Sequence, residues 1–143
     1  MDVNTINRAI KITEAVQLCL IEELSQISNH ERYPDGCCEI ASSILLSILR
    51  QEGIREFSLI KGEHPRYIFH FWLESESHVI DLTAHQFDGI EEPFIMLDKD
   101  LYTLSQEGYF SDRRNSDIDN TWSYLTDVMV RFEKIFYEKY YEA

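Results

Sequence analysis

The sequence predicts an α+β fold, with two helices first, an antiparallel sheet in the middle and one helix last. Three observations favour it. Apolar residues recur at helical spacing in two segments near the start of the chain and in one near its end. Between them lie short runs of β-branched and aromatic residues separated by polar turns. The 143 residues fit one domain, residues 1–143, of a size that buries a substantial core.

Two helices are predicted before the sheet. Residues 4–28 form an amphipathic pattern, with apolar side chains at Ile6, Ile10, Val16, Leu20, Leu24 and Ile27. Residues 37–52 carry a broader apolar face, which predicts that most of this helix is buried; the face consists of Ile40, Ala41, Ile44, Leu45, Ile48 and Leu49. Gly53 follows in the position that commonly ends a helix.

The sheet is predicted from strands at residues 56–61, 67–74 and 78–83, with a further strand at 94–97. Residues 74–77 form a polar connection of hairpin length, so the second and third strands should pair antiparallel. Residues 101–119 show weak periodicity and are expected to be irregular. The last helix, residues 119–140, should be capped by Asp117 or Asp119. Its apolar face consists of Trp122, Leu125, Met129, Phe132, Phe136 and Tyr140.

Net charge and cysteine content restrict the partners and the compartment that the sequence allows. The net charge of −13 argues against a nucleic-acid partner, because phosphate backbones select clustered Lys and Arg. It favours either solubility or attraction to a basic partner. The longest apolar run, residues 40–49, is too short to span a bilayer, so no membrane partner is expected. The first residues lack the pattern of a signal peptide, and three cysteines with two adjacent are typical of a reduced, cytoplasmic protein.

Two adjacent cysteines stand where the second predicted helix begins. Cys38 follows Gly36 closely and should lie in the first turn, whereas Cys37 should lie at the cap. Unpaired N–H groups at a helix N-terminus stabilise a thiolate, as does a neighbouring imidazolium. The two side chains should diverge by about 100°, so only one can face a base, and Cys38 is favoured as the nucleophile. The alternative is that both are small buried hydrophobes.

A base and an acid are predicted on two later strands. His70 stands in a run of apolar residues, where an imidazole needs a hydrogen-bond partner. Asp81 lies on the next predicted strand, and its charge also needs a partner. Folding the hairpin brings the two close together, although a slip of one residue would turn Asp81 to the other face of the sheet. The alternative is a core histidine satisfied by the backbone.

The other histidines fit the site less well. Three of them are expected at the surface, namely His30, His64 and His78. His85 lies close enough to Asp81 in the sequence to be a rival base. Gln86 could donate its amide to an oxyanion, but an ordinary polar role in a loop also accounts for it.

A metal or cofactor site is not predicted. Cys37, Cys38, His70 and His85 could be combined into a zinc site on paper. Adjacent cysteines converge poorly on one ion, because zinc motifs normally separate them by about two to four residues. The sequence also lacks a Gly-rich phosphate loop and a serine nucleophile motif.

Together these motifs resemble the papain-like cysteine hydrolases of the transglutaminase-like type. Residues 36–42 match the Gly-x-Cys segment at a helix start, residues 70–74 the His-x-Trp strand and residues 79–83 the Asp-x-Thr strand. Residues 33–42 and 81–87 also resemble segments of small bacterial and phage papain-like proteins, which read Phe-Pro-x-Gly-x-Cys-x-x-Ala-Ser and Asp-x-Thr-x-x-Gln-Phe. Here Tyr33 stands where phenylalanine is usual. The resemblance covers residues 33–87.

The resemblance implies a papain-like fold in which the nucleophile helix packs on a small antiparallel sheet, with helices at both ends. It implies Cys38 as nucleophile, His70 as base and Asp81 as acid, although the residues after Cys37 also fit the register of some transglutaminase-like proteins. The expected function is cofactor-free hydrolysis or acyl transfer at an amide bond, as in a peptidase or a glutamine deamidase. The expected substrate is a protein or peptide, and a basic one would suit the charge. The alternative is an inactive papain-like fold that serves as an acidic binding or inhibitory module.

Overall fold

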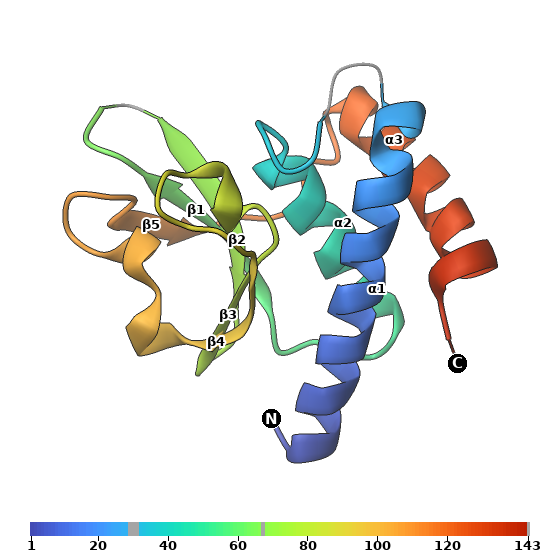
Figure 1. The fold of residues 1–143 in the computed structure, drawn as a ribbon, viewed down its shortest axis with the longest axis horizontal. Helices are drawn as coiled ribbons and strands as arrows, with labels where there is room; N and C mark the ends of the chain where they lie inside the picture. The colour runs from blue at the N-terminus through green and yellow to red at the C-terminus, as the bar shows by residue number, and fades with distance from the viewer. Residues whose placement is uncertain (29–31, 67, 143) are drawn as a thin grey trace.

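The structure is a computed structural model that describes residues 1–28, 32–66 and 68–142. These residues form the predicted α+β fold (Figure 1). The elements in chain order are α1 (Val3–Ile27), α2 (Cys38–Gln51), β1 (Ser58–Glu63), β2 (Phe69–Glu74), β3 (His78–Asp81), η1 (Ala84–Gln86), β4 (Phe94–Asp98), η2 (Lys99–Leu101), η3 (Thr103–Ser105), β5 (Asp112–Asn115), α3 (Ser123–Ile135) and the π-helical turn η4 (Phe136–Tyr140).

The sheet has the strand order β4-β3-β2-β1-β5, and every neighbouring pair is antiparallel. The predicted hairpin between β2 and β3 is present, with Leu73 opposite Ile80. The edge strand β5 corrects the expectation that residues 101–119 are irregular. All residues of β5 are exposed and none is apolar, so no alternation of apolar and polar residues marks it as a strand.

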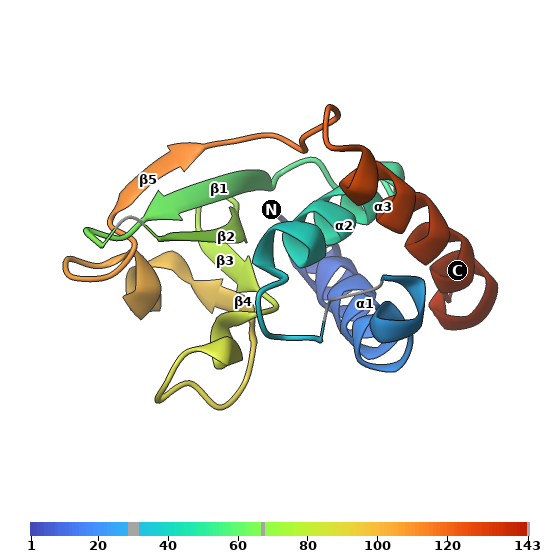
Figure 2. The same cartoon turned by 90° about the horizontal axis from the view of Figure 1, so that it is seen from above.

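The helices α1, α2 and α3 lie on one side of the sheet, and α2 is the innermost (Figures 1 and 2). It contacts β1 and β2 on one side and α1 and α3 on the other. Every residue of its predicted apolar face is buried, and Gly53 has the positive φ of 82° that suits a helix end. Because α2 is packed on both sides, its N-terminus is held firmly against the sheet.

The opposite face of the sheet has a core of its own, since side chains alternate between the two faces. Its buried residues are Ile60, Trp72, Val79, Ala84, Tyr102, Leu104 and Phe110. Gly62 permits this packing, because a Cβ there would lie 2.5 Å from Trp72 Cη2 and 2.7 Å from Phe110 Cβ. The segment between β4 and β5 therefore helps to close this face.

The start of the last helix differs from the prediction. Trp122 is the N-cap of α3 and no described side chain caps the helix, so the predicted cap by Asp117 or Asp119 is wrong. Asp119 instead accepts hydrogen bonds from the Thr121 backbone nitrogen at 3.0 Å and hydroxyl at 2.6 Å, and so closes the preceding turn. Trp122, predicted on the apolar face, is 36 % exposed, whereas Val128 is buried in the core.

Candidate active site

The two adjacent cysteines have different surroundings. Cys37 is the N-cap of α2, is 1 % exposed and directs its sulfur to the Pro34 carbonyl oxygen at 3.5 Å. Cys38 is the first residue of the helix and is partly exposed. Gly36, with a φ of 68°, supplies the turn that leads into the helix. Cys38 is thus the member of the pair that a substrate could reach.

His70 and Asp81 meet in the interior. Both side chains are 0 % exposed, and His70 Nε2 lies 2.7 Å from Asp81 Oδ2. The strand register explains the contact: with Leu73 opposite Ile80, Asp81 falls opposite Trp72, on the face that also carries His70. The predicted pairing of the two side chains is present, in the register that keeps both on one face.

The buried charge of Asp81 is balanced by several donors. Oδ2 accepts from the Tyr102 hydroxyl at 2.6 Å as well as from His70 Nε2. Oδ1 accepts from the Thr83 backbone N–H at 3.1 Å and from its hydroxyl at 3.4 Å. A buried carboxylate is tolerated only when its lone pairs are satisfied in this way. Sequence reasoning missed Tyr102, because it lies in the segment expected to be irregular and no pattern links it to Asp81.

Burial and charge act on His70 in opposite directions. Burial favours the neutral imidazole, but the charge of Asp81 and its hydrogen bond, with a smaller contribution from Cys38, favour the imidazolium more strongly. The pKa of His70 rises from 6.5 to about 9 as a result. His70 is therefore protonated at neutral pH, which suits the cation of a thiolate–imidazolium pair.

The second ring nitrogen of His70, Nδ1, is not held by Asp81. Nδ1 is buried, and it has no hydrogen-bond partner of ordinary geometry in residues 1–28, 32–66 and 68–142. The Cys38 thiol is nevertheless close enough to interact with the ring. Since Asp81 holds Nε2, Nδ1 is the nitrogen left for the thiol.

Three aromatic side chains pack against the His70 ring. The ring centroid of Phe87 lies 4.9 Å away, that of Phe110 5.3 Å and that of Trp72 5.7 Å. These contacts exclude water from the imidazole and fix its plane. They come from the segment after β3, from the segment before β5 and from β2, so three separate parts of the chain position the His70 ring.

The loop before α2 is fastened to the segment after β3 at two points. The Tyr33 hydroxyl donates to the carbonyl oxygen of Leu82, and the Gly36 N–H donates to Gln86 Oε1 at 3.2 Å. The second contact orients the Gln86 amide, whose Nε2 is buried and lacks a partner within the described part of the chain. An unused amide donor is therefore anchored to the loop that leads into α2.

The remaining histidines are placed as follows. The rival base, His85, bonds to no carboxylate among the described residues; its ring packs against Tyr33 at 5.3 Å, and burial lowers its pKa. Of those expected at the surface, His64 and His78 are partly buried. The prediction for His30 lies outside the described residues.

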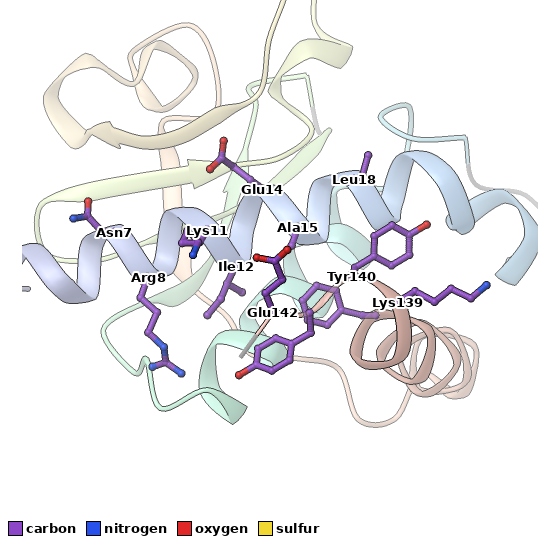
Figure 3. A pocket seen from close by; sticks show the side chains of 12 residues that line it. Asn7, Arg8, Lys11, Ile12, Glu14, Ala15, Leu18, Lys139, Tyr140 and Glu142 are labelled. Carbon is purple, nitrogen blue, oxygen red and sulfur yellow. The ribbon is translucent and has the colours of Figure 1, made fainter.

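A hollow of about 840 Å³ lies elsewhere, between α1 and the C-terminal residues (Figure 3). Arg8, Ile12 and Tyr140 are among the side chains that line it, and no lining residue belongs to the candidate site. Across the described residues, no group of three or more His, Cys, Asp or Glu side chains is placed to hold a metal ion. Cys38, His70 and Asp81 are thus grouped apart from the hollow.

No helix in the described ranges has both the length and the apolarity needed to cross a membrane. The function of the site has to follow from the chemistry of its side chains. No family model, curated protein or solved structure matches the chain.

Proposed function

We propose that the chain is a thiol enzyme that hydrolyses or transfers acyl groups at amide bonds, with Cys38 as nucleophile, His70 as base and Asp81 as orienting acid. One observation carries the proposal. The partly exposed thiol of Cys38 interacts with an imidazole whose Nε2 is held by a buried carboxylate and whose Nδ1 makes no other hydrogen bond among the described residues. A thiol at a helix start, an imidazole and a buried carboxylate in contact in this order are the groups that a cysteine nucleophile requires.

The reaction runs in two halves. The Cys38 thiolate attacks the amide carbonyl carbon, and the C=O π electrons move to the oxygen. When the carbonyl re-forms, the C–N bond breaks, and the His70 imidazolium gives its proton to the departing amine. A thioester remains on Cys38. His70 then takes a proton from water as that water attacks the thioester. The C–S bond breaks, which releases the carboxylic acid and restores the Cys38 thiolate beside the His70 imidazolium; an amine in place of water gives acyl transfer.

Asp81 has an orienting role in this proposal. By accepting from Nε2–H, it sets the imidazole so that Nδ1 is the nitrogen that exchanges protons with the thiol and the leaving group. Its charge also stabilises the imidazolium. The Thr83 donors on Oδ1 keep the carboxylate in the plane that this contact requires.

The oxyanion formed during the attack needs donors near the start of α2. The Cys38 backbone N–H is one, because the first N–H groups of a helix have no acceptor within the helix. Gln86 is the other in this proposal, since its Oε1 is anchored by Gly36 and its buried Nε2 is unused among the described residues. A donor of this kind is worth about 10²–10³ in kcat.

The wider features of the chain support a particular class of thiol enzyme. The nucleophile helix, the antiparallel sheet packed on it and the order Cys38, His70, Asp81 support a papain-like hydrolase of the transglutaminase-like type. The net charge of −13 supports a protein or peptide substrate with basic residues near the reacting amide. The odd cysteine count with an adjacent pair supports the reducing conditions of the cytoplasm.

Thiol alkylation tests the proposal without knowledge of the substrate. The native chain is treated with iodoacetamide at pH 6, and the modified residues are located by mass spectrometry. If Cys38 is the proposed nucleophile, it should react about ten-fold faster than free cysteine or more, because the neighbouring His70 activates it. His70→Ala should remove the advantage. Cys37→Ala is the matched control and should leave the rate unchanged, since Cys37 is 1 % exposed and faces Pro34.

Two results decide the outcome. A native Cys38 that reacts no faster than free cysteine at pH 6 would refute the nucleophile. Once a substrate is found, Cys38→Ala should abolish turnover while the circular dichroism spectrum stays native; full activity in that variant would also refute it.

The second candidate function is an acidic binding or inhibitory module on the same fold. It is favoured by the charge of −13, which suits a basic partner protein. The complete burial of His70 is also compatible with an inert core. This function predicts slow alkylation of Cys38 together with binding that weakens as salt rises, as measured by calorimetry with a basic peptide.

A further inference from the structure

Tyr102 lies behind the acid of the candidate site, in the segment that connects β4 to β5. It is 1 % exposed, and its ring packs against Trp72 and Phe94 with centroids 5.2 and 5.9 Å away. Its hydroxyl donates to Asp81 Oδ2 at 2.6 Å, and His70 Nε2 lies 2.7 Å from the same oxygen. One carboxylate oxygen therefore serves two donors.

Two donors on one oxygen divide its charge. A hydroxyl bonded to a carboxylate draws negative charge toward itself, and this weakens the attraction of that oxygen for an imidazolium. We propose that Tyr102 is a positioning residue: its hydroxyl fixes the Asp81 carboxylate beside His70 and limits how tightly His70 holds its proton. The catalytic consequence rests on the proposed function, whereas the effect on His70 does not.

The hydroxyl of Tyr102 stays protonated wherever the protein is folded under ordinary conditions. Burial, followed by the charge of Asp81, raises the pKa of Tyr102 well above its usual value of 10.0. The phenol therefore acts as a constant donor and does not exchange protons with His70. This separates a positioning role from that of an acid or a base.

Other titratable groups face the same cluster, and the substitution of Tyr102 leaves them in place. They are Cys38 on α2, Glu74 on β2, Tyr33 in the loop before α2 and His85 on η1. Glu74 is itself paired with Arg113 and, at 3.9 Å, with Lys99. A change in the titration of His70 after removal of one hydroxyl therefore reports on that hydroxyl.

Residues 101–110 supply several of the side chains that surround the His70–Asp81 pair. Tyr102, Leu104 and Phe110 are buried in the second core, and the Phe110 ring lies 5.3 Å from that of His70. A segment with three side chains built into a core is a fixed wall behind the site. It supplies the hydroxyl that braces the acid and an aromatic face that holds the base.

The test is a pH titration of His70 by NMR, on the full chain carrying ¹³C-labelled histidine. In Tyr102→Phe, one hydrogen bond to the charged Asp81 is lost, and the His70 midpoint should rise by about half to one pH unit from the wild-type value. Tyr109→Phe is the control, because Tyr109 lies in the same region but is 49 % exposed. It should leave the His70 midpoint unchanged.

A His70 midpoint that stays at the wild-type value in folded Tyr102→Phe overturns the proposal, because a packing role alone would lower stability and leave the titration in place. Should that variant fail to fold, the test is the His70 titration of the wild-type chain produced with 3-fluorotyrosine. Its more acidic phenol is a stronger donor, so the midpoint of His70 should fall, and an unchanged midpoint again overturns the proposal. A shifted midpoint together with slow alkylation of Cys38 would reject the proposed function and leave the role of Tyr102 standing.

Discussion

The His70–Asp81 pair should make the stability of the fold depend on pH within a defined window. Burial alone would lower the pKa of His70, but Asp81 outweighs it and holds the folded value at about 9, against 6.5 for an ordinary histidine. A group with a raised folded pKa binds its proton more tightly in the native state. Its contribution is therefore complete below pH 6.5 and is lost as the pH rises through 9. At about 1.4 kcal/mol per pH unit, the loss is about 3 kcal/mol.

Asp81→Asn is the perturbation that isolates this effect. The asparagine removes the charge that favours the imidazolium and leaves burial, which favours neutral His70. Urea unfolding is followed at intervals from pH 6 to pH 9.5. The wild type should lose about 3 kcal/mol of unfolding free energy across this range, and Asp81→Asn should lose much less. The difference between the two curves cancels the other groups that titrate in the same range.

A second histidine–aspartate pair, whose carboxylate is exposed, provides the matched control. His78 Nε2 lies 3.5 Å from Asp98 Oδ1, and the Asp98 side chain is 71 % exposed. Asp98→Asn should therefore stay within about 1 kcal/mol of the wild type at every pH, because solvent around the Asp98 carboxylate screens its attraction to His78. Parallel curves for the wild type and Asp81→Asn would show that Asp81 adds no proton affinity to His70, and the electrostatic account of the site would fail.

Two further substitutions test the surroundings of the site. Gly62→Ala should lower the unfolding free energy by about 2 kcal/mol, because the added Cβ would lie 2.5 Å from Trp72 Cη2. An unchanged urea midpoint would contradict the tight packing of the second core. Gln86→Ala should slow the acylation of Cys38 by p-nitrophenyl acetate about 100-fold and leave its alkylation by iodoacetamide unchanged, since only acylation forms an oxyanion. Equal losses in both reactions would mean that Gln86 acts on the thiol itself.

The helices and the central hairpin could be predicted because their apolar patterns are strong. The face of α2 from Ile40 to Leu49 repeats at helical spacing, and burial in two directions leaves few polar interruptions. The contact between His70 and Asp81 was also within reach of the sequence. Two polar side chains in neighbouring apolar strands joined by a short turn have few other partners available.

The parts that escaped prediction lack such a pattern. Strand β5 is held at an edge by backbone pairing with β1, and its exposed polar side chains do not alternate. Tyr102 reaches Asp81 across a long stretch of chain, so only the folded path of the β4–β5 segment brings them together. The prediction that Asp119 caps α3 is wrong because the Asp119 carboxylate bonds to Thr121, which precedes the helix.

Residues 81–86 make three contacts over a short length of backbone. Asp81 bonds to His70, the Leu82 carbonyl oxygen accepts from the Tyr33 hydroxyl, and the Gln86 side-chain oxygen accepts from the Gly36 N–H. The length of this segment therefore matters, because one inserted residue would displace the Gln86 amide relative to Asp81 and break its contact with Gly36. The neighbouring stretch, residues 88–93, is mostly exposed and is the place where the chain can absorb insertions. A transfer of the His70–Asp81 pair to another scaffold would therefore have to include residues 81–86 and the loop at 33–36 together.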